Sequence, residues 1–188
     1  RLALVERVEP GYFTQPQSVA GMRVLTTRAS RALGSGTVSF GTVELSSQVV
    51  GYLRRDAETG DVWDFNPLQL PERHLTTQAT WWTLPPQVLG GLDLEAASLP
   101  GAVHGAEHTA IGLLPAFVPC DRWDIGGLST VLHPDTGMAT VFVHDGMAGG
   151  AGFAHRGFDV AEDWLRATLD RLVRCTCEAG CPSCVVSP

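Results

Sequence analysis

The chain has 188 residues, which is enough for one sizeable core or for two small lobes that share an interface. Its 13 basic residues are all arginines, and its 20 acidic residues bring the formal net charge to −7, which argues against broad, non-specific affinity for nucleic acid. Neither a lysine-containing phosphate loop nor the protein-kinase motifs occur, no apolar run could span a bilayer, and no signal-peptide pattern follows Arg1. We therefore expect a piece of a longer cytoplasmic protein that does not hydrolyse ATP by those routes.

The first half of the chain alternates apolar and polar side chains, which predicts strands. Residues 2–8 and 22–27 each read as a strand, and residues 32–36 read as a loop. Residues 37–54 predict two strands of an antiparallel meander, and the polar run 56–61 predicts a hairpin tip.

Two further strands are predicted before residue 85, a short one at 63–70 and a clear one at 74–84 that is rich in Thr and aromatic residues. Trp81 and Trp82 are adjacent, so they point to opposite faces of that strand. At least one belongs to the core; the other is a candidate for stacking on a base or on a neighbouring domain.

Helical periodicity replaces alternation after Pro85-Pro86. Residues 87–97 predict a weak helix, and residues 101–117 predict a strong one that Pro115 should kink or end. The expected fold class is α+β, with an antiparallel, strand-rich N-terminal half and a helical C-terminal half. We divide it into a strand-rich lead at 1–85, part of the same domain, and a helix-rich zinc-binding part at 86–188.

The strong helix carries an H-x-x-E-H string. His104 and His108 are four residues apart, so they share a helix face where both could bind one metal ion while Glu107 activates water, as in a zinc-dependent hydrolase. Such an enzyme needs a further acidic ligand, and Glu162 and Asp163 are the near candidates. The alternative is a histidine pair that is simply packed and hydrogen-bonded on the helix.

The loop at 119–128 contains Cys120, which we expect to be a small buried hydrophobe far from any metal. Its charged residues Asp121, Arg122 and Asp124 could form an ion-pair network or place carboxylates near the two histidines.

Two strands, 128–132 and 139–144, are joined by a turn and lead into the glycine-rich run 145–152. Close packing of helix against strand explains that run better than a phosphate cradle, because neither phosphate-binding glycine pattern is present. We then expect Asp159 to cap a helix at 160–174. The apolar residues predicted to pack inward from it are Val160, Trp164, Leu165, Leu169 and Leu172.

Four of the five cysteines lie within the last 14 residues, with spacing C-x-C-x3-C-x2-C: Cys175, Cys177, Cys181 and Cys184. Soft thiolates in a tetrahedral array suit Zn²⁺, and this is the predicted cofactor. Gly180 can take the positive φ of a tight turn between the ligand pairs. The alternatives are an iron–sulfur cluster, which also takes four thiolates, paired disulfides, or a redox-active Cys-x-x-Cys pair.

The run from residue 104 to residue 184 resembles the zinc-binding C-terminal domain of the mitomycin-repair-factor-A-like helicases, which are superfamily 2 DNA helicases related to the Hrq type. The resemblance rests on HGAEHTAIGLLP at 104–115, CDRWDIGG at 120–127, FVHDG at 142–146 with GGAGF at 149–153, and the four clustered cysteines.

This resemblance implies a non-catalytic zinc-binding accessory domain of an ATP-dependent DNA helicase involved in DNA repair, supporting folding and DNA handling. It also implies that the four clustered cysteines are the ligands, that the partners are the helicase motor domains of the same chain, and that DNA is met through the full-length protein, with no membrane involved. The competing hypotheses are the hydrolase centred on Glu107 and a pure protein-interaction module.

Overall fold

The computed structural model describes residue 4 and residues 9–185, so the strand predicted at residues 2–8 lies outside the described residues apart from Leu4. Two compact units emerge from the contacts: the first combines residues up to Gly21 with Ser46–His74, and the second combines Met22–Leu45 with the residues from Leu75 onward. The predicted boundary at residue 85 remains a prediction. Within the described part, no helix is long and apolar enough to cross a membrane.

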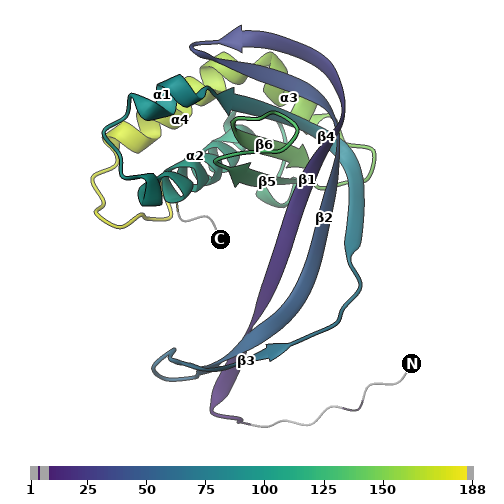
Figure 1. Cartoon of the computed structure of the whole chain (residues 1–188), viewed down its shortest axis with the longest axis vertical. Coiled ribbons are helices and arrows are strands. Elements are labelled where there is room, and N and C mark those ends of the chain that lie inside the picture. Colours follow the sequence, from purple (N-terminus) through teal and green to yellow (C-terminus); the bar gives the residue numbers. More distant parts are fainter. Residues whose placement is uncertain (1–3, 5–8, 186–188) are drawn as a thin grey trace. The chain divides into compact units, whose positions relative to one another are not determined.

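Six strands form the sheet (Figure 1). They are β1 (Tyr12–Leu33), β2 (Gly36–Asp56), β3 (Val62–Pro67), β4 (Arg73–Leu84), β5 (Ile125–Thr130) and β6 (Ala139–Asp145). Their order is β1-β2-β4-β6-β5, and β3 pairs with β2. The pairs β2–β3, β4–β6 and β5–β6 are antiparallel, and the first of them lies in the half predicted to be antiparallel and strand-rich.

The first two strands are much longer than the sequence pattern predicts. Residues 37–54 are not two strands, because β2 runs through them without a break, and the loop predicted at 32–36 shrinks to Gly34 and Ser35. Gly41 does not interrupt the strand. A Cβ there would lie 1.9 Å from the carbonyl oxygen of Thr26, so glycine is needed for the close approach of the β1 backbone.

The first unit contains the predicted hairpin tip. Asp56 accepts hydrogen bonds from the backbone N–H groups of Glu58 and Thr59 at 2.9 and 3.0 Å, and these bonds lower the pKa of its carboxyl group. Arg54 forms an ion pair with Asp64 across the β2–β3 pair. The strand predicted at 63–70 is shorter than expected, since β3 ends at Pro67.

Four α-helices belong to the second unit among the described residues: α1 (Pro86–Gly90), α2 (Leu99–Leu113), α3 (Phe153–Asp159) and α4 (Ala161–Arg174). The weak helix predicted at 87–97 is confirmed only at its start, because the short α1 ends at Gly90 and a separate 3-10 turn forms at Ala96–Ser98. The prediction for Pro115 is confirmed: α2 ends at Leu113, and a 3-10 turn, Leu114–Ala116, contains the proline.

The predicted cap at Asp159 is wrong. This residue ends α3, and its carboxylate lies 3.6 Å from the guanidinium of Arg156 on the same helix. Helix α4 instead begins after Val160, which has no side chain able to cap it. Helix α3 lies before residue 160, in a stretch for which the sequence pattern predicted no helix.

The sheet of the second unit has a buried core on each face. The two tryptophans of β4 enter different cores: Trp82 packs edge-on against Trp164 of α4, with ring centroids 5.6 Å apart, and Trp81 packs against Phe142 of β6 at 5.7 Å. The alternation predicted for them is therefore confirmed. Neither is the exposed candidate for stacking on a base or a neighbouring domain, because Trp81 and Trp82 are only 3% and 8% exposed.

Val103 and Ala110 of α2, together with Leu114 of the 3-10 turn that follows the helix, are buried in the first core. The indole N–H of Trp164 donates to the carbonyl of Ala110 at 2.8 Å, which fixes α4 against α2. On the other face, His133 from the β5–β6 connection covers Phe142, with ring centroids 4.8 Å apart.

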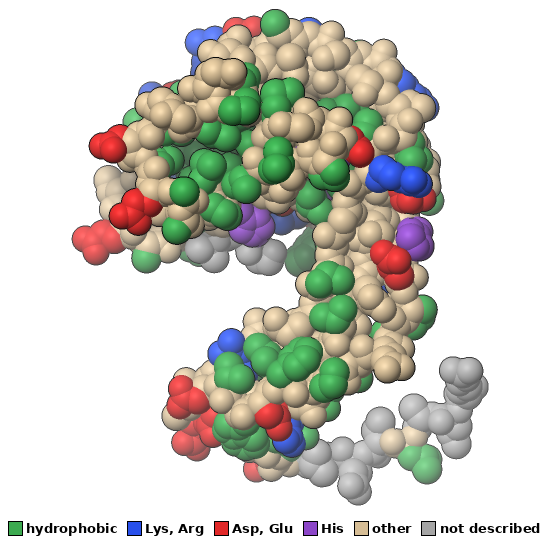
Figure 2. All heavy atoms as spheres, in the orientation of Figure 1, with side chains coloured by type: hydrophobic (Ala, Val, Ile, Leu, Met, Phe, Trp, Pro, Cys, Tyr) green, Lys and Arg blue, Asp and Glu red, His purple; other side chains and the backbone are tan. Residues whose placement is uncertain are grey.

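Not all of the predicted inward residues of α4 enter the core. Leu169 is 59% exposed, which corrects its predicted burial. With Leu165 and Leu172 it lines an apolar groove of about 420 Å³ to which α1 contributes Val88. Figure 2 shows hydrophobic side chains gathered over α1 and α4.

Candidate metal centre

The four clustered cysteines come together directly after α4. Helix α4 ends at Arg174, Cys175 is extended, and Gly180 has a φ of +86°, as its predicted turn requires. The Sγ atom of Cys175 lies 3.3 Å from Sγ of Cys177 and 3.6 Å from Sγ of Cys181. The Sγ atom of Cys184 lies 3.4 Å from Sγ of Cys177 and 3.6 Å from Sγ of Cys181. One closed ring of sulfur contacts therefore joins all four side chains.

This donor set fits a single zinc ion. Four sulfurs at about 2.3 Å from one ion lie roughly 3.8 Å from each other in a tetrahedron, close to the separations found here. A disulfide needs about 2.05 Å between sulfurs, and all five cysteines are free thiols. The backbone N–H of Cys181 donates to the sulfur of Cys184 at 3.2 Å and lowers the pKa of that thiol to about 6. The site thus already stabilises one thiolate, which is the form that binds metal.

The cysteine cluster is attached to α2. The hydroxyl of Thr109 lies between two carbonyl oxygens, that of Gly105 at 2.9 Å and that of Cys184 at 3.3 Å, and shares its one proton between them; Thr109 and Cys184 are both buried. One turn earlier on the same helix, a Cβ added at Gly105 would lie 3.2 Å from Cγ1 of Val185. The absence of a side chain at Gly105 is therefore what lets the end of the described chain lie against the helix.

We expect Gly105→Leu to lower the free energy of unfolding by about 1–3 kcal/mol, because the new side chain displaces Val185 and the cysteine cluster from α2. The matched control is Gly112→Leu on the same helix, where a Cβ meets nothing within 4 Å. A better helix former there should stabilise the chain by about 0.5–1 kcal/mol. Thermal melts in zinc-containing buffer compare the two, and equal melting temperatures would contradict the attachment.

A second cluster of potential ligands lies on α2, where the sequence predicts it. The Nε2 atoms of His104 and His108 are 3.0 Å apart, and Nδ1 of His104 is 3.0 Å from Oε2 of Glu107. The His104 side chain is 60% exposed, whereas Glu107 is only 4% exposed. Burial is the main reason that the pKa of His108 is lowered, and the nearby His104 adds to this.

Glu107 is enclosed from the sheet side. The hydroxyl of Ser129 on β5 donates to its Oε2 at 2.5 Å, and a Cβ at Gly127 would lie 2.6 Å from its Oε1. Gly127 thus allows the strand to pass directly over the carboxylate. The structure does not bring the acidic residues predicted to complete a hydrolase site into this cluster; Glu162 instead pairs with Arg166 at 3.0 Å.

The charged loop before β5 caps a short turn. Asp121 accepts a hydrogen bond from the N–H of Trp123 at 3.1 Å, and Asp124 accepts one from the N–H of Asp121 at 2.8 Å. These carboxylates are used within the loop and do not join the histidine cluster. Cys120 is half-buried against the first core, and burial raises the pKa of its thiol, in agreement with a packing role.

Asp145 has a structural role that the sequence pattern did not predict. This fully buried residue ends β6, and its carboxylate accepts three hydrogen bonds, from the N–H groups of Ala151, Gly152 and Ala154 at 2.6, 2.8 and 2.7 Å. The amides of the glycine-rich run therefore hold an internal carboxylate instead of an external phosphate. An Asp directly before a glycine-rich run was the available signal.

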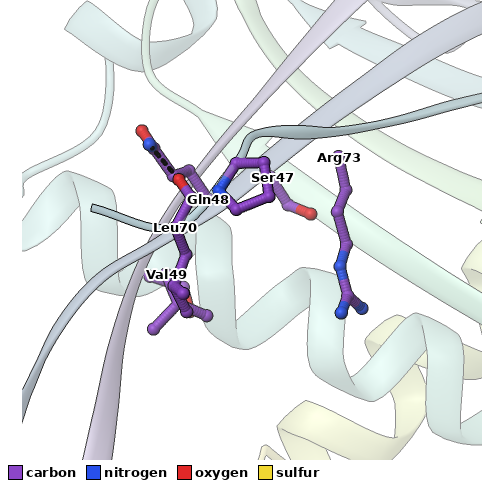
Figure 3. Close-up of a pocket in the computed structure, with 7 residues that line it drawn as sticks. Ser47, Gln48, Val49, Leu70 and Arg73 are labelled. Atoms are coloured by element: carbon purple, nitrogen blue, oxygen red, sulfur yellow. Dashed lines mark hydrogen bonds between the residues drawn. The ribbon is translucent and has the colours of Figure 1, made fainter. Parts of the chain in front are cut away.

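The first unit contains a pocket of about 230 Å³ between β2 and the segment after β3 (Figure 3). Gln48 closes one side by donating from Nε2 to the carbonyl of Leu70 at 2.7 Å, and Arg73 is the charged residue of the lining. Since no Cys, His or carboxylate lines this pocket, it is not a metal site.

Comparison with known proteins finds a matching family model and several relatives. A family model described as the MrfA Zn-binding domain matches residues 106–185. The chain is 25% identical over 183 residues to the uncharacterized ATP-dependent helicase YprA of Bacillus subtilis, covering 97% of this chain and 24% of YprA. It is 37% identical over 90 residues to the uncharacterized protein MJ1572.1 of Methanocaldococcus jannaschii, covering 45% of this chain and 79% of that protein.

The fold is also found in a solved structure, that of the DUF1998 helicase MrfA bound to DNA. The TM-score is 0.73 at 24% identity, and the match covers 96% of this chain and 24% of the MrfA chain. The chain thus spans about a quarter of the length of the helicases it resembles.

Proposed function

Because the chain belongs to the MrfA Zn-binding domain family through residues 106–185, we propose that Cys175, Cys177, Cys181 and Cys184 hold one structural Zn²⁺. We propose further that this chain is a non-catalytic accessory domain of a cytoplasmic, ATP-dependent DNA helicase that acts in DNA repair. Its contribution is to fold around the metal and to support the handling of DNA by the full-length protein.

The observation that carries the proposal is the attachment of the cysteine cluster to α2. Zinc with four thiolates has no open coordination position for water, so the metal serves the fold and not a reaction. The cluster fixes the residues after α4, and its contacts at Thr109 and Gly105 fix them to a second helix. Zinc binding of this kind contributes on the order of 10 kcal/mol of apparent free energy in small zinc-folded peptides.

The helicase context is supported by the relatives, since YprA is an uncharacterized ATP-dependent helicase and MrfA is a helicase whose structure was solved with bound DNA. The motor domains of such a protein are the expected partners of this chain. The net charge of −7 fits a domain that meets DNA only as part of a larger surface.

Elemental analysis of the untagged chain by plasma mass spectrometry tests the metal assignment. We expect one zinc and no iron per chain. Stoichiometric iron would instead identify the cysteine cluster as an iron–sulfur site. In the full-length protein, removing this region should leave ATP hydrolysis largely intact while DNA unwinding falls. Unchanged unwinding would contradict the accessory role.

The hydrolase hypothesis is tested separately by Glu107→Gln. A general base must reach a water molecule, whereas Glu107 is buried and accepts a hydrogen bond from Ser129. We therefore expect helicase activity of the full-length protein to survive this substitution. Hydrolytic activity of the isolated chain that Glu107→Gln abolishes would instead favour the enzyme.

A further inference from the structure

The H-x-x-E-H string remains without a function in the proposal above, yet the fold gives it a specific geometry. His104 and His108 direct their Nε2 atoms toward each other at 3.0 Å. Two imidazole nitrogens bound to one metal ion at about 2.1 Å lie roughly 3.0 Å apart when they subtend a right angle, and about 3.4 Å apart at the tetrahedral angle. The observed separation falls within the range that one ion requires.

The tautomer of His104 is set by its neighbour. Its Nδ1 lies 3.0 Å from a carboxylate oxygen of Glu107, which can only accept, so the proton resides on Nδ1 and the lone pair on Nε2. A carboxylate that holds the far nitrogen of a histidine in this way is the usual support of a metal-binding imidazole. Ser129 and the backbone at Gly127 in turn hold that carboxylate.

Exposure distinguishes this cluster from the cysteine site. His104 is largely exposed, so an ion between the two Nε2 atoms would keep positions open to water or to an external ligand. Imidazole donors suit zinc, copper and nickel. The cysteine cluster, by contrast, offers four donors, and it contacts the same helix at Gly105 and Thr109.

We propose that His104 and His108 form a second, solvent-accessible site for a divalent transition-metal ion on α2, with Glu107 as a positioning residue and not as a general base. The two sites differ in strength and exchange: the cysteine site retains its ion, and the histidine site exchanges its ion with solution.

The test is a calorimetric titration in which zinc is added to the chain whose cysteine site already holds its ion. We expect one further equivalent to bind saturably and to be lost in both His104→Ala and His108→Ala. The matched control is His74→Ala, which removes a histidine lying 3.5 Å from a carboxylate oxygen of Glu72 on a different element from α2. Cys181→Ser should lose the first ion and keep the second, which separates this site from the cysteine site.

The positioning role of Glu107 has its own readout. Glu107→Gln should weaken the second equivalent 10- to 100-fold, while Glu72→Gln, which changes the carboxylate beside His74, should leave it unchanged. Nitrogen-15 NMR of the unsubstituted chain should show the two Nε2 resonances shifting together during the titration, so the result does not depend on how the variants fold. The proposed site would be overturned if no second equivalent of zinc bound saturably, or if the parent chain, His104→Ala and His108→Ala all bound it equally.

Discussion

Cys181→Ser is expected to purify without zinc and to melt well below the parent chain. The serine hydroxyl is a poor donor for zinc beside three thiolates, so the ring of sulfur contacts opens at the residue that touches both Cys175 and Cys184. The contacts of the cluster with Thr109 and Gly105 are then lost as well. A loss of about 3 kcal/mol corresponds to roughly 6–12 °C for a chain of this size.

Cys120→Ser is the matched control, because it changes the fifth cysteine, which packs against the core outside the cluster. We expect full zinc content in this variant and a loss of about 1 kcal/mol from the buried hydroxyl. Metal analysis and thermal unfolding on the same samples check both outcomes. A Cys181→Ser chain with one zinc and an unchanged melting temperature would contradict the proposed ligand set.

The second large effect is expected at Asp145. In Asp145→Asn one carboxylate oxygen becomes an NH₂ group, which cannot accept a hydrogen bond, so at least one N–H among Ala151, Gly152 and the buried Ala154 faces another donor. Each unsatisfied buried donor costs about 1–3 kcal/mol, and the remaining bonds lose their charge assistance. We expect a total loss of about 3 kcal/mol and protease sensitivity at the glycine-rich run.

Asp121→Asn provides the comparison for this prediction. Asp121 also accepts a backbone hydrogen bond, but its site is exposed and an amide oxygen can replace the carboxylate oxygen. Its melting temperature should stay close to that of the parent. If the two variants melt alike, the buried carboxylate does not organise the run, and an external anion becomes a reasonable occupant of those amides.

The metal centre could be predicted from the sequence because all of its donors are local. Four cysteines within ten positions can meet without any knowledge of the rest of the fold, and Gly180 has the positive φ that the spacing requires. The α2 histidine cluster is local for the same reason, since residues four apart on a helix share a face.

The features that were predicted wrongly depend on partners distant in sequence. Gly41 looks like a break in a strand until the carbonyl of Thr26 is found against it, so β2 could not be recognised as one strand. Leu169 continues the apolar period of α4, yet no element of the described structure covers it. The carboxylate of Asp145 contacts the amides that it binds only because the chain folds back after β6 to begin α3 beside it.

The two kinds of contact at the cysteine cluster also differ in when they can form. The donors close a loop of only ten residues, whereas the contact of Cys184 with Thr109 joins residues 75 positions apart. Since the entropy cost of closing a loop rises with its length, the metal can be captured by a chain that is otherwise still unfolded, before the cluster reaches α2. Zinc still stabilises the folded chain, because only there does the loaded cluster also gain its contacts with Thr109 and Gly105, so loss of the ion lowers the melting temperature. In kinetic terms, the ion orders residues 175–184 early in folding, and this ordered segment contacts α2 later.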